Sequence, residues 1–321
     1  MKDKEKNKFS LLDKKIWVTG HGGMVGQAIL KKLKKIKCRV ILCKKDELDL
    51  TIQKDVSKWV DKKKPDVIFH AAAVVGGINA NIKNPTKFLS DNIYISFNVI
   101  NAAKIAKVKK LVNLGSSCIY PKNSIQPIKE NQLLTGELET TNQWYSIAKI
   151  SSIKLCEALK IQYDCNFISI MPTNLYGPND NFSDNNAHVP GALMNRLHIA
   201  KINGAPQISV WGTGKPKREF MHVDDLADAC LFLAENYNSE KIINVGSNDE
   251  ISIKKFAQLL KKIIGYRGKL IFDSTKPDGI QRKLLDSKKI YKLGWKPKIQ
   301  LCEGLKDYYS WYLENINTIR K

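Results

Sequence analysis

The sequence predicts an α/β protein with a doubly wound parallel sheet, and three observations support this prediction. Short apolar segments rich in β-branched residues recur through the first half of the chain, and longer segments with helical periodicity separate them. A glycine-rich turn joins the first apolar segment to the first helical one. Such alternation is typical of parallel sheets with helices on both faces.

The expected strands all lie between residues 16 and 170. They cover residues 16–18, 40–42, 67–69, 111–114 and 167–170. The first helix follows the glycine-rich turn, because Val25, Ile29, Leu33 and Ile36 recur at three- and four-residue spacing and form one apolar stripe.

The pattern changes after about residue 175, where residues 179–186 are rich in Asn and Asp without a clear period. A helix expected over 223–236 and a strand expected over 242–246 would return to the first sheet. We therefore predict three parts, two of them interleaved. They are a mobile basic tail (1–14), a nucleotide-binding domain (15–175, joined by 221–247) and a smaller, partly interleaved α/β substrate lobe (176–321).

Composition limits the class of protein. The chain has 321 residues, of which 43% are hydrophobic, enough for a full core. It has neither an apolar run of membrane-spanning length nor a secretory signal pattern, so we expect a cytoplasmic protein. Seven cysteines lack C-x-x-C spacing and five histidines lack metal-ligand spacing, so we expect neither disulfides nor a bound metal.

The formal net charge of +22 raises a nucleic-acid-binding alternative. The lysines are spread over expected helix faces and turns without interleaved aromatics, which favours a generally basic surface. A polyanionic small substrate would also benefit from that field. A salt-sensitive gel shift with random DNA would test the alternative.

The glycine-rich turn predicts a dinucleotide site of the Rossmann type. Gly20, Gly23 and Gly26 stand where the chain must turn tightly and approach a diphosphate, and Met24 and Val25 begin the helix. The free N–H groups at that helix N-terminus would bind the anion.

Lysines follow the second strand, where NAD-binding folds place an acidic residue against the ribose. Lys44 and Lys45 suit a 2′-phosphate and favour NADP over NAD, although Asp46 is adjacent. The two lysines could also be part of the basic surface.

Tyr145 and Lys149 lie one helical turn apart if a helix begins here, which would place both on one face. The ammonium is expected to lower the pKa of the phenol, so that Tyr145 can exchange a proton with a carbonyl oxygen. Ser116, directly after the fourth strand, could hydrogen-bond the same oxygen.

Taken together, these motifs resemble the extended short-chain dehydrogenase/reductases and, within them, the GDP-L-fucose synthase family, from about Lys15 to the C-terminus. That family acts as GDP-4-keto-6-deoxy-D-mannose 3,5-epimerase-4-reductase. Seven further blocks carry the resemblance: residues 115–121, 171–178, 180–182, 187–190, 211–214, 218–220 and 282–286.

The resemblance implies a role for each catalytic candidate. Cys118 as base and His188 as acid would invert C3 and C5, whose protons the C4 ketone acidifies. Tyr145 would protonate the C4 oxygen during hydride transfer from NADPH, with Lys149 tuning it and Ser116 orienting the oxygen. Tyr145, Lys149 and His188 are also implied to contact the cofactor.

The resemblance also implies a substrate site and an assembly. Arg196, Arg218 and Lys283 match positions that face the GDP diphosphate and sugar. Trp211 would cover the sugar, although a core tryptophan is an equally fair interpretation. A homodimer is implied, through the helix after Lys83 and the helix that bears Tyr145.

One departure from the family pattern and two further alternatives remain. The family commonly has an arginine in the glycine turn where this chain has Gly22, which removes a phosphate contact. A GDP-L-colitose synthase would use the same residues but invert only C5. A sugar epimerase that keeps its nicotinamide bound would not need Cys118 and His188. The remaining histidines are expected to be structural: His21, His70, His198 and His222.

Overall fold

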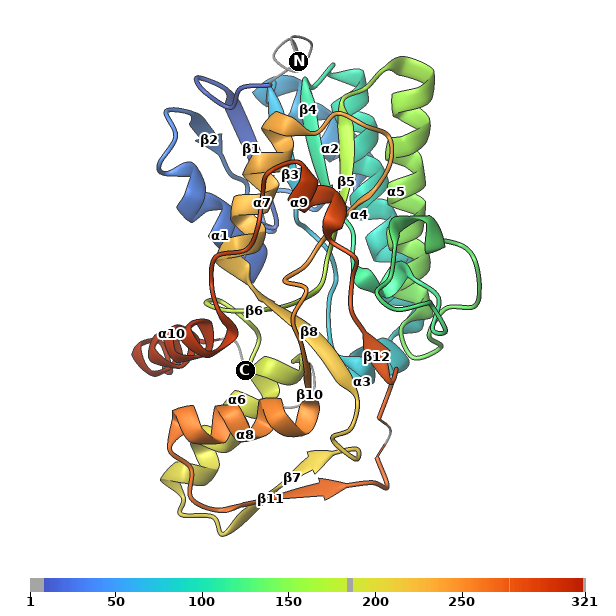
Figure 1. The fold of residues 1–321 in the computed structure, drawn as a ribbon. Helices are drawn as coiled ribbons and strands as arrows, with labels where there is room; N and C mark the ends of the chain where they lie inside the picture. Colours follow the sequence, from blue (N-terminus) through green and yellow to red (C-terminus); the bar gives the residue numbers. More distant parts are fainter. Residues whose placement is uncertain (1–8, 184–186, 277, 320–321) are drawn as a thin grey trace.

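Six parallel strands form the main sheet, in the order β2-β1-β3-β4-β5-β9 (Figure 1). The computed structural model describes residues 9–183, 187–276 and 278–319. The strands of the main sheet are β1 (Lys15–Thr19), β2 (Arg39–Ile41), β3 (Val67–His70), β4 (Lys110–Leu114), β5 (Phe167–Pro172) and β9 (Ile243–Val245). The predicted doubly wound parallel sheet is confirmed.

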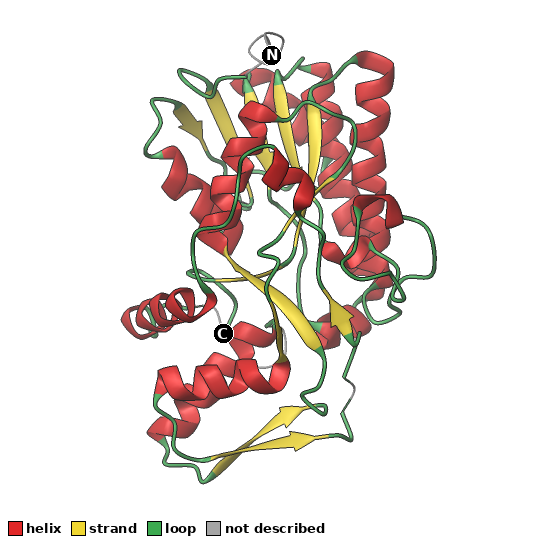
Figure 2. Cartoon of the chain, in the orientation of Figure 1, coloured by secondary structure: helices red, strands yellow, loops and turns green. Residues whose placement is uncertain are grey.

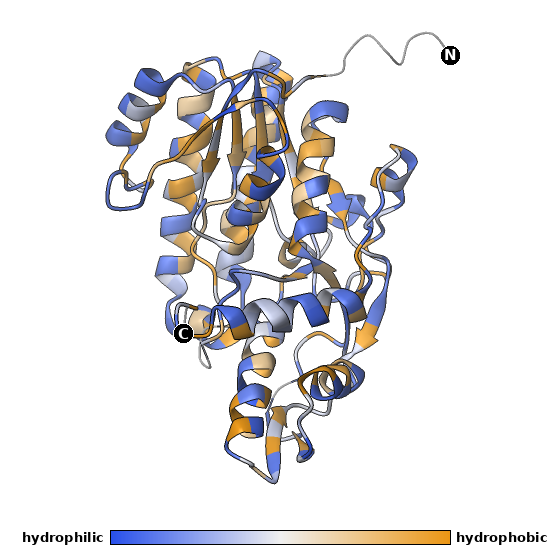
Figure 3. Ribbon diagram, turned by 90° about the vertical axis from the view of Figure 1, so that its left-hand side faces the viewer, coloured by the Kyte–Doolittle hydropathy of each residue, from blue (hydrophilic) through white to orange (hydrophobic). Residues whose placement is uncertain are grey.

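Helices cover both faces of this sheet because side chains alternate along each strand. Ile16 and Val18 of β1 join the core under one face, whereas Trp17 joins the core under the other. Figure 3 colours these strands mostly as hydrophobic. The first face carries α1 (Met24–Leu33) and α7 (Val223–Asn236), and the second carries α2 (Gln53–Lys63), α4 (Pro85–Ile105) and α5 (Gln143–Tyr163).

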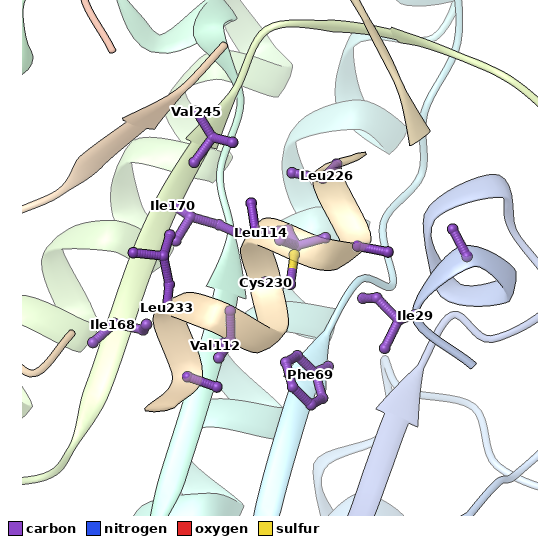
Figure 4. Close-up of a cluster of buried hydrophobic side chains, with 14 of the residues drawn as sticks. Ile29, Phe69, Val112, Leu114, Ile168, Ile170, Leu226, Cys230, Leu233 and Val245 are labelled. Atoms are coloured by element: carbon purple, nitrogen blue, oxygen red, sulfur yellow. The ribbon is translucent and has the colours of Figure 1, made fainter. Parts of the chain in front are cut away.

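The core beneath α7 shows how the chain returns to the sheet. Leu226, Cys230 and Leu233 point from α7 toward β4 and β5 (Figure 4). Ile243 of β9 pairs with Ile170 of β5, which adds the sixth strand. The first helix ends at Leu33, so its apolar stripe is shorter than the sequence pattern predicts.

The second lobe is a smaller α/β unit (Figure 2). Strand β8 is its centre and pairs with β6, β10 and β12, while β7 and β11 form a separate ribbon. The strands are β6 (Asn174–Tyr176), β7 (Gln207–Trp211), β8 (Lys217–His222), β10 (Glu250–Ser252), β11 (Lys269–Asp273) and β12 (Arg282–Lys283). Its helices are α6 (Val189–Ile202), α8 (Ile253–Ile264) and α10 (Leu301–Glu314).

Four short helices complete the described chain. They are α3 (Ile78–Lys83), α9 (Lys288–Lys292) and the 3-10 turns η1 (Ser117–Ile119) and η2 (Glu130–Gln132). Near α9, Ile290 and Trp295 pack into the core of the sheet lobe. The segment around α9 therefore also belongs to the sheet lobe. The sequence pattern predicts such a return only for residues 221–247.

The N-terminal segment corrects the predicted mobile tail. Residues 1–8 lie outside the described residues, but residues 9–14 pack against the sheet lobe. Leu11 is fully buried, and the Phe9 amide donates to the Glu235 carbonyl at 3.1 Å. The prediction of a mobile tail gave weight to the many lysines of the segment. It overlooked Phe9 and Leu11, whose apolar side chains pack into the core.

Within the described residues, no helix is both long enough and apolar enough to cross a membrane.

Candidate active site

A cavity of about 890 Å³ lies at the carboxyl ends of the main-sheet strands and extends to β8 of the substrate lobe. The segments that follow β1, β2, β3, β4 and β5 all contribute to its wall. Parallel sheets place their ligand sites at this edge because the strands end there together.

The glycine turn forms one end of the cavity. Gly20 has φ +67°, and a Cβ there would lie 2.7 Å from the Ala72 backbone nitrogen. A Cβ on Gly26 would overlap the Gly20 carbonyl. Met24 and Val25 begin α1 and line the cavity, so this helix N-terminus faces the space that the glycines keep open. The turn therefore suits a close-fitting diphosphate.

Gly22 differs from its neighbours in the turn, because a Cβ there would meet nothing within 4 Å. The absence of a side chain at this position is therefore not required by packing.

The two lysines after β2 lie at the cavity wall. Lys44 and Lys45 are exposed and line the cavity, whereas Asp46 is not among the lining residues. This arrangement favours a 2′-phosphate over a free ribose hydroxyl, because the cations face the site and the carboxylate does not.

The structure brings Ser116, Tyr145 and Lys149 together. Ser116 follows β4, Tyr145 lies in the first turn of α5, and both line the cavity. One turn further along α5, the Lys149 ammonium donates to the Leu114 carbonyl at 2.8 Å and lies 5.8 Å from the Tyr145 ring centroid.

The electrostatics of this group correct one sequence expectation. The pKa of Tyr145 is raised, not lowered, because enclosure by protein and the nearby Cys118 disfavour the phenolate. Enclosure also lowers the pKa of Lys149 to about 8. The predicted lowering fails because enclosure of the phenol outweighs any stabilisation of its phenolate by the nearby ammonium. Tyr145 therefore keeps its proton at neutral pH and is available as a proton donor.

Cys118 occupies η1, two residues after Ser116, and lines the same cavity. Lys283 of β12 donates to its Sγ at 3.4 Å. Burial would raise the pKa of the thiol, but the Lys283 charge, a hydrogen bond with Ser116 and the more distant Arg218 together lower it. The site therefore favours a thiolate at Cys118.

His188 precedes the first residue of α6 and lines the cavity from the substrate lobe. Enclosure and the Lys283 charge lower the pKa of its imidazole. Protonated His188 is thus a stronger acid than an ordinary imidazolium. Arg218 also lines the cavity, and the register of β8 and β12 sets it beside Lys283.

Two predicted substrate residues are placed elsewhere. Arg196 donates to the Ser209 carbonyl at 3.1 Å and is not among the lining residues. Trp211 also lies outside the lining and is 48% exposed, with Lys276 5.9 Å from its ring centroid. The alternative interpretation of Trp211 as a core residue is therefore wrong.

The sequence reasoning missed part of the cavity wall. Residues 71–76, a run of small apolar residues after β3, line the cavity, as does Asp180, whose carboxylate accepts from the Tyr308 hydroxyl at 2.8 Å. The position of 71–76 directly after an expected strand was the available signal. For Asp180 the available signal was the block 180–182, which carries part of the family resemblance.

Three of the other histidines have hydrogen-bond partners within the protein, as expected, whereas His21 lines the cavity. His70 hydrogen-bonds Thr19 at 2.9 Å, His198 hydrogen-bonds Tyr309 at 3.0 Å, and His222 accepts from the Asp224 amide at 3.2 Å.

Comparison with known proteins gives a consistent result. The model of the NAD dependent epimerase/dehydratase family matches residues 16–246. GDP-L-fucose synthase 1 of Arabidopsis thaliana is 53% identical over 310 residues, covering 96% of each chain. GDP-L-colitose synthase of Yersinia pseudotuberculosis is 39% identical over 305 residues, covering 94% of this chain and 99% of that protein. The crystal structure of a GDP-L-fucose synthetase from Naegleria fowleri bound to NADP superposes with a TM-score of 0.91 at 31% identity, covering 98% of each chain.

Proposed function

This chain belongs to the NAD-dependent epimerase/dehydratase family, and we propose that it acts as a GDP-L-fucose synthase. It converts GDP-4-keto-6-deoxy-D-mannose to GDP-L-fucose by inverting C3 and C5 and then reducing C4 with NADPH. The identity to the plant GDP-L-fucose synthase, 53%, exceeds the 39% identity to the colitose enzyme.

One observation carries the proposal: two chemically distinct groups meet at one cavity, five of their six members line it, and the sixth, Lys283, contacts Cys118. We call Ser116, Tyr145 and Lys149 the reduction group, and Cys118, His188 and Lys283 the epimerisation group. A phenol that holds its proton suits ketone reduction, and a thiol biased toward thiolate suits removal of a proton from carbon. A plain reductase or a plain epimerase would need only one of these groups.

The residues present fit NADP. The space that Gly20 and Gly26 keep open at the N-terminus of α1 would hold the diphosphate, and Lys44 and Lys45 would hold the 2′-phosphate. When bound, NADPH supplies the hydride for C4.

The reduction group acts on the C4 oxygen. Ser116 donates a hydrogen bond that orients this oxygen, and Tyr145 transfers its phenolic proton to it as C4 is reduced. The Lys149 ammonium stabilises the phenolate that remains.

The epimerisation group acts at C3 and C5. Cys118 takes the proton from carbon onto its sulfur, and the electron pair of the C–H bond moves onto the ketone oxygen as an enolate. His188 returns a proton from the opposite face, which inverts the centre. Both side chains then recover their starting protonation states by exchange with solvent.

Incubation with GDP-4-keto-6-deoxy-D-mannose and NADPH, followed by NMR of the sugar product, tests the proposal. We expect GDP-L-fucose. A 6-deoxy sugar with C3 and C5 uninverted would show a plain reductase. Inversion at C5 alone would favour the colitose-type enzyme.

We also propose that the enzyme forms a homodimer through α4 and α5. These two long helices pack together and leave Tyr94, Ile147 and Ile161 exposed, and Ile161 is 72% exposed. Light scattering should give twice the chain mass, and Ile161→Asp should shift the protein toward monomer.

Seven free cysteines support a cytoplasmic location, where thiols stay reduced.

A further inference from the structure

Strands β8 and β12 together place two cations, Arg218 and Lys283, on the side of the Cys118 thiol. Arg218 pairs in register with Lys283. Arg218 lines the cavity, and Lys283 contacts the lining residue Cys118. The next residue of β8, Glu219, has its side chain on the other side of the strand, as alternation requires.

Lys283 is held close to Cys118 by its surroundings. Its residue is only 8% exposed, and its ammonium donates to the Cys118 sulfur at 3.4 Å. A lysine that served only a diphosphate would be expected to direct its ammonium into open cavity space. This contact instead joins two residues that are 165 positions apart and come from different lobes.

Glu219 is fully buried, and two backbone amides donate to its carboxylate. One carboxylate oxygen accepts from the Asn248 amide at 2.7 Å, and the other accepts from the Leu285 amide at 3.1 Å. Leu285 lies two residues after Lys283. The carboxylate therefore joins β8 to the end of β12 and fixes the position from which Lys283 reaches the thiol.

We propose that Lys283 is a catalytic residue of the epimerisation steps, as the counter-ion that keeps Cys118 ionised, and that Glu219 is the positioning residue that holds Lys283 there. The proton still moves from carbon to the Cys118 sulfur, and Lys283 stays protonated throughout. This inference rests on the proposed function and assigns Lys283 a task beyond the substrate contact expected from the sequence.

The thiolate can be measured without substrate, so the inference and the proposed function can fail separately. Iodoacetamide reacts with the thiolate form, and mass spectrometry of the peptides reports the rate at each cysteine. Cys302 on α10 is exposed and serves as the internal reference in the same molecule. The pH dependence of the rate at Cys118, relative to that at Cys302, reports ionisation of the Cys118 thiol.

Lys283→Met removes the charge and keeps most of the side-chain length. An opposite charge within about 4–6 Å shifts a pKa by about 1–3 units, so alkylation of Cys118 at pH 7 should slow at least about tenfold. Lys283→Arg keeps the cation and should retain most of the rate. The matched control is Arg282→Met, which removes a cation from the same strand that pairs with Glu250 at 2.7 Å, and it should leave the rate unchanged.

Glu219→Gln tests the positioning role, because an amide nitrogen cannot accept from a backbone N–H. The pH profile of Cys118 alkylation should move part of the way toward that of Lys283→Met. In the double variant, Glu219→Gln should add no further movement, since the ammonium it positions is gone. A merely structural contribution would lower the melting temperature yet leave the pH profile in place.

The inference is overturned if Cys118 in Lys283→Met is alkylated as fast as in the wild type and in the Arg282→Met control. It is also overturned if the effects of Glu219→Gln and Lys283→Met on the pH profile of Cys118 alkylation simply add. Failure to form GDP-L-fucose by a wild-type protein whose thiol does depend on Lys283 would instead overturn the proposed function. If Lys283→Met unfolds, Lys283→Gln removes the same charge with a polar side chain, and an unchanged rate at Cys118 in that variant would overturn the inference.

Discussion

The reduction group and the epimerisation group share one cavity but are assembled differently. Ser116, Tyr145 and Lys149 all come from the sheet lobe, where β4 and α5 pack directly against the same core. In the epimerisation group only Cys118 comes from that lobe, whereas His188 and Lys283 come from the substrate lobe. With the proposed roles, we expect reduction to depend on the sheet lobe alone and epimerisation to depend on how the two lobes meet.

The largest expected effect separates the two groups directly. Tyr145→Phe keeps the ring and removes the proton that C4 reduction needs, so turnover to the reduced product should fall about 10²–10⁴-fold. Deuterium wash-in at C3 and C5 of the keto sugar, followed by NMR without NADPH, should continue. Tyr94→Phe, which removes a phenol exposed on α4, is the matched control. Turnover near the wild-type level would remove Tyr145 from the mechanism.

Cys118→Ser should have the opposite effect and impair epimerisation but not reduction. The variant keeps the size of the side chain but leaves a far weaker base. Deuterium exchange at both carbons should fall about a hundredfold or more, while reduction through Tyr145 is spared. The product should be an unepimerised or partly epimerised 6-deoxy sugar. Cys302→Ser controls for loss of a thiol elsewhere. Exchange at the wild-type rate would make the Cys118 thiol a bystander.

Gly26→Ala should weaken NADPH binding, which reduction needs, without affecting the proton exchange that needs no NADPH. The added Cβ meets the Gly20 carbonyl, and overpacking of this kind costs about 1–3 kcal/mol. NADPH affinity measured by fluorescence titration should fall by up to about a hundredfold, whereas exchange without NADPH should persist. Gly22→Ala adds a Cβ to open space in the same turn and should cost much less. Equal losses for the two variants would contradict the packing argument.

The smallest effect concerns cofactor choice, which should affect reduction alone. Wild-type kcat/KM should be higher with NADPH than with NADH, and Lys44→Asp with Lys45→Ala should erode that preference roughly tenfold. The control is Lys34→Asp with Lys35→Ala, an exposed pair that changes the net charge equally but lies away from the cavity. Equal kcat/KM for both cofactors in the wild type would show that Lys44 and Lys45 are not phosphate ligands.

Local patterns predicted much of the fold and part of the site. Residues 223–236 form the expected helix with the expected bounds, because its apolar spacing is complete within the segment. Ser116, Tyr145 and Lys149 were found because strand ends and helical turns place them. The proximity of Lys283 to Cys118 had no such signal, since only the pairing of β12 with β8 creates it.

The electrostatic errors have the same origin. Tyr145 was expected to have a lowered pKa because Lys149 is near in sequence, but enclosure by residues distant in sequence reverses the direction. The buried Glu219 was overlooked because a carboxylate between Arg218 and Phe220 resembles an ordinary charged strand residue until its amide partners are known.

The late arrival of β9 has a consequence for synthesis of the chain. Once residues up to Pro172 have left the ribosome, five strands can pair, but the edge of β5 stays open until Ile243–Val245 emerges. The face that α7 covers, with Leu226 and Leu233, stays bare over nearly the same interval. At about 5–20 residues per second the nascent protein exposes an unpaired strand and an apolar surface for several seconds. We therefore expect it to need a chaperone during translation more than a protein whose sheet is completed in sequence order.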